Sequence, residues 1–357
     1  MNTILSKANK ILHSNLKKSD SPFTIRRRAN LLHVCLGSNG CRLSRMGSCT
    51  MCNYGLGEMI SEKDINRMMA CVREHEKIID SVLIGSYGSI FDTLEIPEHI
   101  LDAVIDGLSD IDIRIIIFET HYTTVTKEIL KKVSTKLVGK DIVIELGLES
   151  TDETVLEQCL NKSINLREFK GKIELIHDYG MSVSANVFLG APFLSIKEQI
   201  DDSLNTILQA IDNGIDNIVI FPSNIRENTV LAYLYKNGRY FPVSGWELVE
   251  LLKRIPVQYH DKIYLSWFGD WNDERILVGT YDCCACRILL NEFFNKYLSL
   301  SSACERKKFV DKFIEFSENN SCYCLFKQSL QLTYRNTIEE RANEQQKWLA
   351  RKLNIKL

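Results

Sequence analysis

Three cysteines lie close together in residues 40–54 (GCRLSRMGSCTMCNY), with seven residues between Cys41 and Cys49 and two between Cys49 and Cys52. Three thiolates on one loop can bind three irons of a 4Fe–4S cubane and leave the fourth iron open to a chelating small molecule. Two other interpretations are a zinc loop, which normally takes four ligands, and core cysteines, because free cysteine packs as a small apolar residue. The nearest spare thiol, Cys35, falls on an expected strand, and the spacing therefore favours the cluster.

A second group of cysteines lies near the C-terminus. Cys283 and Cys286 form a CxxC pair, and Cys322 and Cys324 form a CxC pair 35 residues further on. Two close pairs separated by a helix-sized spacer can bring four sulfurs to one metal, either zinc or an iron–sulfur cluster. The alternative is a cysteine-rich pair of packed helices. The spacing predicts a second metal site of either kind, and four cysteines elsewhere in the chain are interpreted as structural (Cys35, Cys71, Cys159, Cys304).

Length and charge limit the architecture and the partners. A chain of 357 residues that is 45% hydrophobic suits one large α/β barrel, which needs about 250 residues, plus a small appendage. The formal net charge of −2 gives no whole-chain signal for a polyanion. Basic residues gather only at the ends, most densely before residue 29, where they predict either a solvated terminal helix or a phosphate-binding segment (Lys7, Lys10, Lys17, Lys18, Arg26, Arg27 and Arg28, against Asp20).

Cysteine usage predicts a reducing compartment. Twelve cysteines without a charged-then-apolar secretory leader argue against a disulfide scaffold and for metal binding in the cytoplasm. No apolar run approaches the roughly 20 residues of a membrane span.

Short apolar runs alternate with amphipathic segments along the chain. The expected strands are residues 31–36, 81–84, 113–118, 141–146, 182–189, 217–221 and 262–267, and the expected helices include 62–79, 97–108, 126–133, 166–179 and 196–212. Strands separated by helices of this length imply parallel crossovers. We predict an α/β fold with a partial or complete (β/α) barrel over residues 31–270, a basic N-terminal extension over 1–30, and a small cysteine-rich, mainly helical region over 271–357.

Polar residues and glycines follow several expected strands. They include residues 85–89 (GSYGS), Glu119, Glu149 with Ser150, and Asn224. Taken singly, a glycine loop is often a plain turn, and a terminal glutamate often starts a helix. Because chemistry in such folds lies at the carboxyl ends of the strands, their joint placement predicts a shared pocket.

Four blocks of the sequence carry a more specific resemblance. They are the cysteine loop with Asn53 and Tyr54, residues 85–97 (GSYGSIFDTLEIP), residues 144–150 (IELGLES) with Asn161 and Lys162, and residues 221–242. Together they resemble the radical S-adenosylmethionine (SAM) superfamily. The particular likeness is to the radical SAM subunit of archaeosine synthase, and more distantly to the tRNA methylthiotransferases and the Elongator catalytic subunit. It covers roughly residues 30–330.

The resemblance implies a set of cofactor-binding residues. Cys41, Cys49 and Cys52 would bind a 4Fe–4S cluster, and the loop with Gly85, Ser86, Gly88 and Ser89 would hold the SAM amino group. Glu149 and Ser150 would bind its ribose, and Met51 and Tyr54 would pack on adenine or serve as ordinary apolar packing. Thr120 stands where relatives often carry a basic residue, which leaves the substrate open.

The resemblance also predicts a function. We expect a radical SAM enzyme, a transferase or lyase, that cleaves SAM reductively and starts radical chemistry on a nitrogen-containing small molecule or amino-acid conjugate. A flavodoxin or ferredoxin would donate the electron. Three alternatives are archaeosine-type tRNA modification by radical C–N cleavage of a lysine-substituted deazaguanine, transfer of the 3-amino-3-carboxypropyl group of SAM, and a non-enzymatic iron–sulfur protein. The near-neutral charge disfavours tRNA, and the glycine and glutamate residues after the strands disfavour the last alternative.

Overall fold

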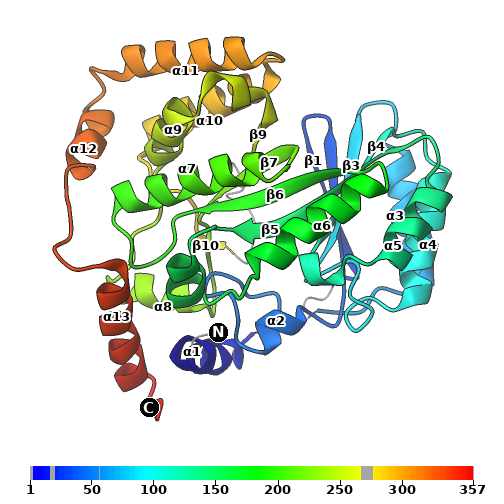
Figure 1. The fold of residues 1–357 in the computed structure, drawn as a ribbon, viewed down its shortest axis with the longest axis horizontal. Coiled ribbons are helices and arrows are strands. Elements are labelled where there is room, and N and C mark those ends of the chain that lie inside the picture. The colour runs from blue at the N-terminus through cyan, green and yellow to red at the C-terminus, as the bar shows by residue number, and fades with distance from the viewer. Residues whose placement is uncertain (1–2, 17–20, 56, 267–275, 357) are drawn as a thin grey trace.

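A curled, open sheet of eight strands forms the centre of the molecule (Figure 1), in a computed structural model that describes residues 3–16, 21–55, 57–266 and 276–356. The strand order is β1-β2-β3-β4-β5-β6-β7-β9, with β2 to β9 parallel and β1 antiparallel to β2. Because β1 and β9 do not pair, the barrel is partial. The strands are β1 Phe23–Arg28, β2 Leu31–Leu36, β3 Ser81–Ser86, β4 Ile115–Thr120, β5 Asp141–Glu149, β6 Ser182–Leu189, β7 Asn217–Pro222 and β9 Ile263–Leu265.

Helices connect the parallel strands as crossovers, as the alternating pattern predicted. They are α3 Glu62–Arg73, α4 Glu98–Ser109, α5 Lys127–Lys136, α6 Leu166–Asp178, α7 Ile196–Asp212 and α9 Gly245–Arg254. Capping boxes at Ser61 and Ser195 start α3 and α7, because the serine oxygen accepts a bond from a backbone N–H that the helix leaves unpaired. Burial alternates along β2 and β4, so one face of the sheet packs on helices and the other borders the open lumen.

Three of the strands were not predicted from the sequence. β1 falls within the expected N-terminal extension and carries Arg26, Arg27 and Arg28 into the sheet edge. A small separate sheet pairs β8 Ile225–Arg226 with β10 Ile276–Val278. Two-residue and three-residue strands carry too few alternating positions to be recognised by periodicity.

The C-terminal region divides between two cores. Helices α10 Cys284–Ser299, α11 Ala303–Ser317 and α12 Ser321–Ser329 extend the main core beside α9, through aromatic contacts such as Trp246 with Phe313 and Tyr323. Helix α13 Ile338–Lys352 instead shares a second core with α1 Thr3–His13 and α8 Val230–Lys236. Figure 1 shows this separation, with α13 beside α1 and α11 at the opposite end of the molecule.

Several predicted features lie outside the described residues. They are Lys17, Lys18 and Asp20 of the basic segment, the end of the expected strand 262–267, and the expected domain boundary at residues 270 and 271. Within the described part of the chain, each helix is too short or too polar to cross a bilayer.

Candidate active site at the carboxyl ends of the strands

The predicted cofactor-binding segments meet at one edge of the sheet. Strands β2 to β7 run parallel, so the cysteine loop after β2, the glycine loop after β3 and Glu149 at the end of β5 all lie at their carboxyl ends. We call this edge the rim. Two short elements complete it: α2 Arg42–Arg45 within the cysteine loop, and the π-helical turn η2 Val155–Leu160 after β5.

Backbone hydrogen bonds shape the cysteine loop. Cys41 is the N-cap of α2, and its N–H donates to Tyr54 O at 2.7 Å, which closes the loop. Cys49 adopts a left-handed conformation with φ of 60°, and its N–H donates to Asn161 O at 3.2 Å. A non-glycine residue seldom adopts this conformation unless its surroundings hold it there. The loop is thus shaped by contacts with η2 as well as by its own sequence.

Two buried asparagines clamp the same loop. Asn9 Nδ2, on α1, is 3.2 Å from the carbonyl oxygens of Gly47, Ser48 and Cys49. Asn161 Nδ2 donates to Gly47 O at 2.7 Å. Asn9 was not predicted from the sequence, although a polar residue that comes four positions after Leu5 on an apolar helix face is a signal for a buried hydrogen-bonding role.

Glu95 connects the cysteine loop to the glycine loop. Its side chain is almost fully buried and accepts from Arg42 N at 2.6 Å and from Ser89 N at 2.7 Å. Gly88 packs so closely that a Cβ there would lie 2.9 Å from Cys41 Cα and would overlap the Glu95 carboxylate. A glycine at position 88 therefore allows the two loops to touch. Glu95 was not identified from the sequence, because its partners lie up to 53 residues away.

A buried ion pair lies next to the cysteines. Lys162 Nζ is 2.8 Å from Glu149 Oε1 and 2.9 Å from Gly147 O, and both charged side chains are largely shielded from solvent. Burial alone would lower the pKa of Lys162, but the Glu149 carboxylate and the Cys49 sulfur outweigh burial and raise it. Lys162 therefore provides a stable positive charge beside the cysteine loop.

Two carboxyl groups line the lumen directly behind this pair. Burial raises the pKa of Glu119 to about 7, and Glu149 adds to the rise while Lys162 opposes it. Burial also raises the pKa of Glu145 to about 8, with a further contribution from Glu119. Neighbouring carboxyl groups in a poorly solvated site cannot all ionise cheaply, so Glu145 is mainly neutral and able to donate a hydrogen bond near pH 7.

Several buried polar atoms on or just after the strands have no hydrogen-bond partner among the described residues, and three of them bear on the site. They are Ser86 Oγ at the end of β3, Asn186 Oδ1 on β6 and Asn224 Oδ1 after β7. Buried polar groups are nearly always paired in native proteins. Their position at and below the rim fits a polar ligand that supplies the missing partners.

Some predicted cofactor-binding side chains are engaged within the protein. Ser89 Oγ lies 2.5 Å from Thr120 Oγ1, and Ser150 Oγ is fully buried and donates to Asp202 Oδ1 at 2.7 Å. Met51 packs against the second core. Tyr54 lies between the Tyr87 ring and the Arg226 guanidinium, with the guanidinium carbon 4.6 Å from its ring centre. Ser89 and Ser150 therefore shape the backbone of the rim, whereas Glu149 and Ser86 remain suited to contact a ligand.

The C-terminal cysteines are only partly brought together. The sulfurs of Cys283, Cys286 and Cys322 lie within 4.8 Å of one another, and Cys324 Sγ is not in this group. Cys324 Sγ instead donates to Glu318 O at 3.2 Å. Residues two apart on a helix point in different directions, which explains why the CxC pair on α12 separates.

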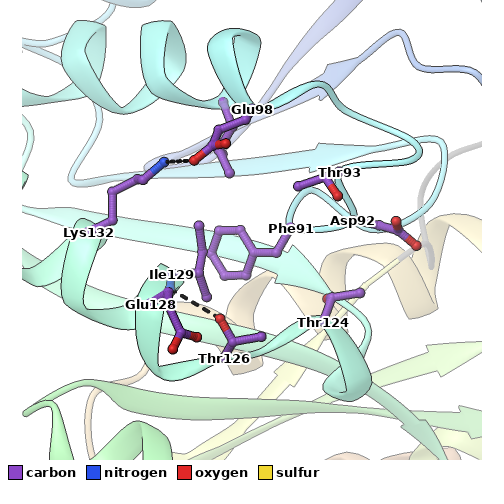
Figure 2. A pocket seen from close by; sticks show the side chains of 10 residues that line it. Phe91, Asp92, Thr93, Glu98, Thr124, Thr126, Glu128, Ile129 and Lys132 are labelled. Atoms are coloured by element: carbon purple, nitrogen blue, oxygen red, sulfur yellow. Dashed lines mark hydrogen bonds and ion pairs between the residues drawn. The ribbon is translucent and has the colours of Figure 1, made fainter.

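A cavity of about 320 Å³ lies between α4, α5 and the loops that follow β3 and β4 (Figure 2). Lys132 Nζ is 2.8 Å from both Glu98 Oε1 and Asp102 Oδ1, and Asp92 in the cavity wall is 3.1 Å from the Arg42 guanidinium of α2. Thr126 caps α5 within the same wall. These groups stabilise the two helices, and the cavity contains no group from the cysteine loop.

Glu145 gives the site a testable pH dependence. Its pKa rises from an ordinary 4.5 to about 8 on folding, so ionisation opposes folding. The free energy of unfolding should fall as pH rises between these two values, and the loss should be complete above pH 8. Glu145→Gln stays neutral, so its free energy of unfolding should fall less than that of wild type, by about 4 kcal/mol between pH 5 and pH 8.5. Urea unfolding of metal-free protein at both pH values measures the difference, and equal falls in the two proteins would contradict the prediction.

Comparisons with known proteins agree with the resemblance predicted from the sequence, although no family model matches the chain. The chain is 26% identical over 301 residues to archaeosine synthase subunit beta of Methanosarcina acetivorans, covering 80% of this chain and 86% of that protein. The subunit from Thermococcus kodakarensis is 24% identical over 243 residues, 66% of this chain and 75% of its own. Among solved structures, methylornithine synthase aligns with a TM-score of 0.48 at 14% identity, covering 91% and 90% of the two chains.

Proposed function

We propose that this radical SAM enzyme, which resembles archaeosine synthase subunit beta, carries its cluster and SAM at the rim and acts on a nitrogen-rich small molecule or amino-acid conjugate. The observation that carries the proposal is the junction of three features at one edge of the sheet. These are a loop with three thiols, a buried Lys162–Glu149 pair beside it, and buried polar atoms without partners among the described residues.

The cysteine loop fits a 4Fe–4S cluster better than a single metal ion. The sulfurs of Cys41, Cys49 and Cys52 do not gather within 4.8 Å of one another, as those of a tetrahedral site would. Thiolates that bind different irons of a cubane lie further apart than thiolates that share one ion. Lys162 offsets part of the negative charge of the loop, while Asn9 and Asn161 hold its backbone. When bound, the cluster supplies the electron for the reductive cleavage of SAM.

SAM would lie between the glycine loop and Glu149. Gly85 and Gly88 carry no side chain that would hinder a close approach, and Ser86 Oγ is available for a polar group. Glu149 is held in place by Lys162, and its carboxylate can accept from a ribose hydroxyl. The role of these residues is to orient SAM and exclude water, so we assign no general acid or base.

The lumen below the rim is suited to a substrate rich in N–H groups. Glu119, Glu145 and Asn186 supply carboxyl and amide oxygens from three adjacent strands, and Asn186 Oδ1 has no partner among the described residues. Gly85, on the neighbouring strand β3, lets the Glu119 carboxylate lie close to the backbone, since a Cβ there would be 2.7 Å from Glu119 Oε2. A nitrogen heterocycle or amino-acid conjugate would pair with these acceptors.

A second candidate is modification of a base within tRNA. The similarity to archaeosine synthase subunit beta over 80% of this chain favours it. In this case a partner subunit would supply much of the RNA-binding surface, because the formal net charge of this chain is −2. A flavodoxin or ferredoxin would serve as electron donor in both cases.

Anaerobic reconstitution with iron, sulfide, SAM and dithionite tests the proposal. We expect SAM cleavage, with mass spectrometry of the SAM fragments identifying the broken C–S bond. Parallel reactions with a free lysine-substituted deazaguanine and with tRNA that carries it distinguish the two substrates. Protein that contains a full cluster but does not cleave SAM would reject the proposed function.

A further inference from the structure

The three sulfurs of Cys283, Cys286 and Cys322 have the spacing of ligands to one small ion. Cys283 Sγ lies 3.8 Å from Cys322 Sγ, and all three sulfurs are within 4.8 Å of one another. A tetrahedral zinc ion with Zn–S bonds of about 2.3 Å separates its sulfurs by about 3.8 Å. The separation exceeds the S–S bond of a disulfide, about 2.05 Å, and the three residues are free thiols.

The backbone around the three cysteines supports negatively charged sulfur. Cys283 is the N-cap of α10, its Sγ accepts from Cys286 N at 3.4 Å, and Cys286 lies in the first turn. Cys322 lies in the first turn of α12, which Asn320 caps by accepting from Cys322 N at 2.9 Å. The positive ends of two helices therefore face the same three sulfurs.

A buried indole adds a donor. Trp246, on α9, is buried, and its indole N–H lies near the Cys286 sulfur. No hydrogen bond with full geometry forms from Nε1 to any described residue. Ligand sulfurs in metal sites commonly receive hydrogen bonds from such neighbours. A more negative Cys286 sulfur on a bound metal would strengthen this contact.

The side chains that could supply a fourth ligand from the protein already form other hydrogen bonds. Asp282 accepts from Ser244 Oγ at 2.7 Å and from Gly245 N at 3.0 Å, at the start of α9. Asn320 caps α12, and Cys324 Sγ donates to Glu318 O. Cys283 is exposed whereas Cys286 is buried, so the open side of the three-sulfur group faces solvent.

We propose that Cys283, Cys286 and Cys322 bind one zinc ion with a water molecule as the fourth, solvent-facing ligand, and that this ion fastens α12 to α10. Binding converts three thiols to thiolates and releases three protons, so zinc and its sulfurs carry a net charge of −1. The site is separate from the rim and does not depend on the proposed function. It differs from the predicted four-cysteine set because Cys324 is not a ligand.

Metal analysis of purified full-length protein, before any reconstitution, tests the site. We expect one zinc per chain, and X-ray absorption at the zinc edge should give three sulfur neighbours and one oxygen. Cys283→Ser and Cys322→Ser should each lower zinc by at least fivefold without changing the iron content. Cys324→Ser and Cys304→Ser are matched controls and should keep a full complement.

Each alternative outcome overturns the proposal. Loss of iron in Cys322→Ser would identify an auxiliary iron–sulfur cluster, and four sulfur neighbours, or zinc loss in Cys324→Ser, would exclude the three-sulfur site. Wild-type protein that contains no zinc and takes up none from a buffered zinc solution would leave the cysteines as packing residues. The wild-type absorption measurement stands even where a variant fails to fold.

Discussion

Replacing Cys41, Cys49 and Cys52 together with alanine is expected to remove about four irons per chain and abolish reductive SAM cleavage. In the proposed site each of these thiolates binds a different iron, so the variant leaves the cluster without any of its protein ligands. Iron analysis, visible absorption and mass spectrometry of SAM fragments after anaerobic reconstitution measure the result. A triple variant that still cleaves SAM at the native rate would show that the cluster assignment is wrong.

The control for this variant is Cys71→Ala. Cys71 lies on α3, and its carbonyl oxygen, rather than its sulfur, contacts His75 Nδ1. The Cys71→Ala protein should therefore retain its full iron content and its SAM cleavage activity. The triple variant should also keep its zinc, because the C-terminal site uses other sulfurs, and zinc analysis thus separates loss of the cluster from general unfolding.

The sequence predicted the rim well because its position depends on local patterns. Alternating apolar runs and helices imply parallel strands, and the loops at the carboxyl ends of parallel strands lie together at one edge of the sheet. The cysteine loop, residues 85–89 and Glu149 could be placed there without any knowledge of long-range contacts.

The supports of the rim could not be predicted in this way. Asn9 reaches carbonyl oxygens about 40 residues away, and Glu95 connects two loops through its buried carboxylate. Such roles depend on which elements meet in three dimensions, and neither local spacing nor helix propensity contains that information.

Removing one member of the Lys162–Glu149 pair should destabilise the rim strongly. The two groups are 2.8 Å apart and mostly buried, so Lys162→Met leaves Glu149 beside Glu119 without its cation. We expect the free energy of unfolding to fall by about 3–5 kcal/mol, the usual cost of an uncompensated buried charge. Glu149→Gln, which leaves Lys162 bonded to Gly147 O, should cost less. Urea unfolding of metal-free protein measures both changes.

The double variant separates the support of the fold from the binding of SAM. Glu149→Gln with Lys162→Met removes both charges, so its stability should recover by about 2 kcal/mol relative to Lys162→Met alone. Its affinity for SAM should not recover, because the carboxylate that we propose as the acceptor of the ribose hydroxyl is absent. We expect SAM to bind the double variant and Glu149→Ala at least fivefold more weakly than wild type, or about 1 kcal/mol, in anaerobic equilibrium dialysis. Native affinity in either protein would mean that Glu149 only balances the charge of Lys162 and that SAM is held by the glycine loop.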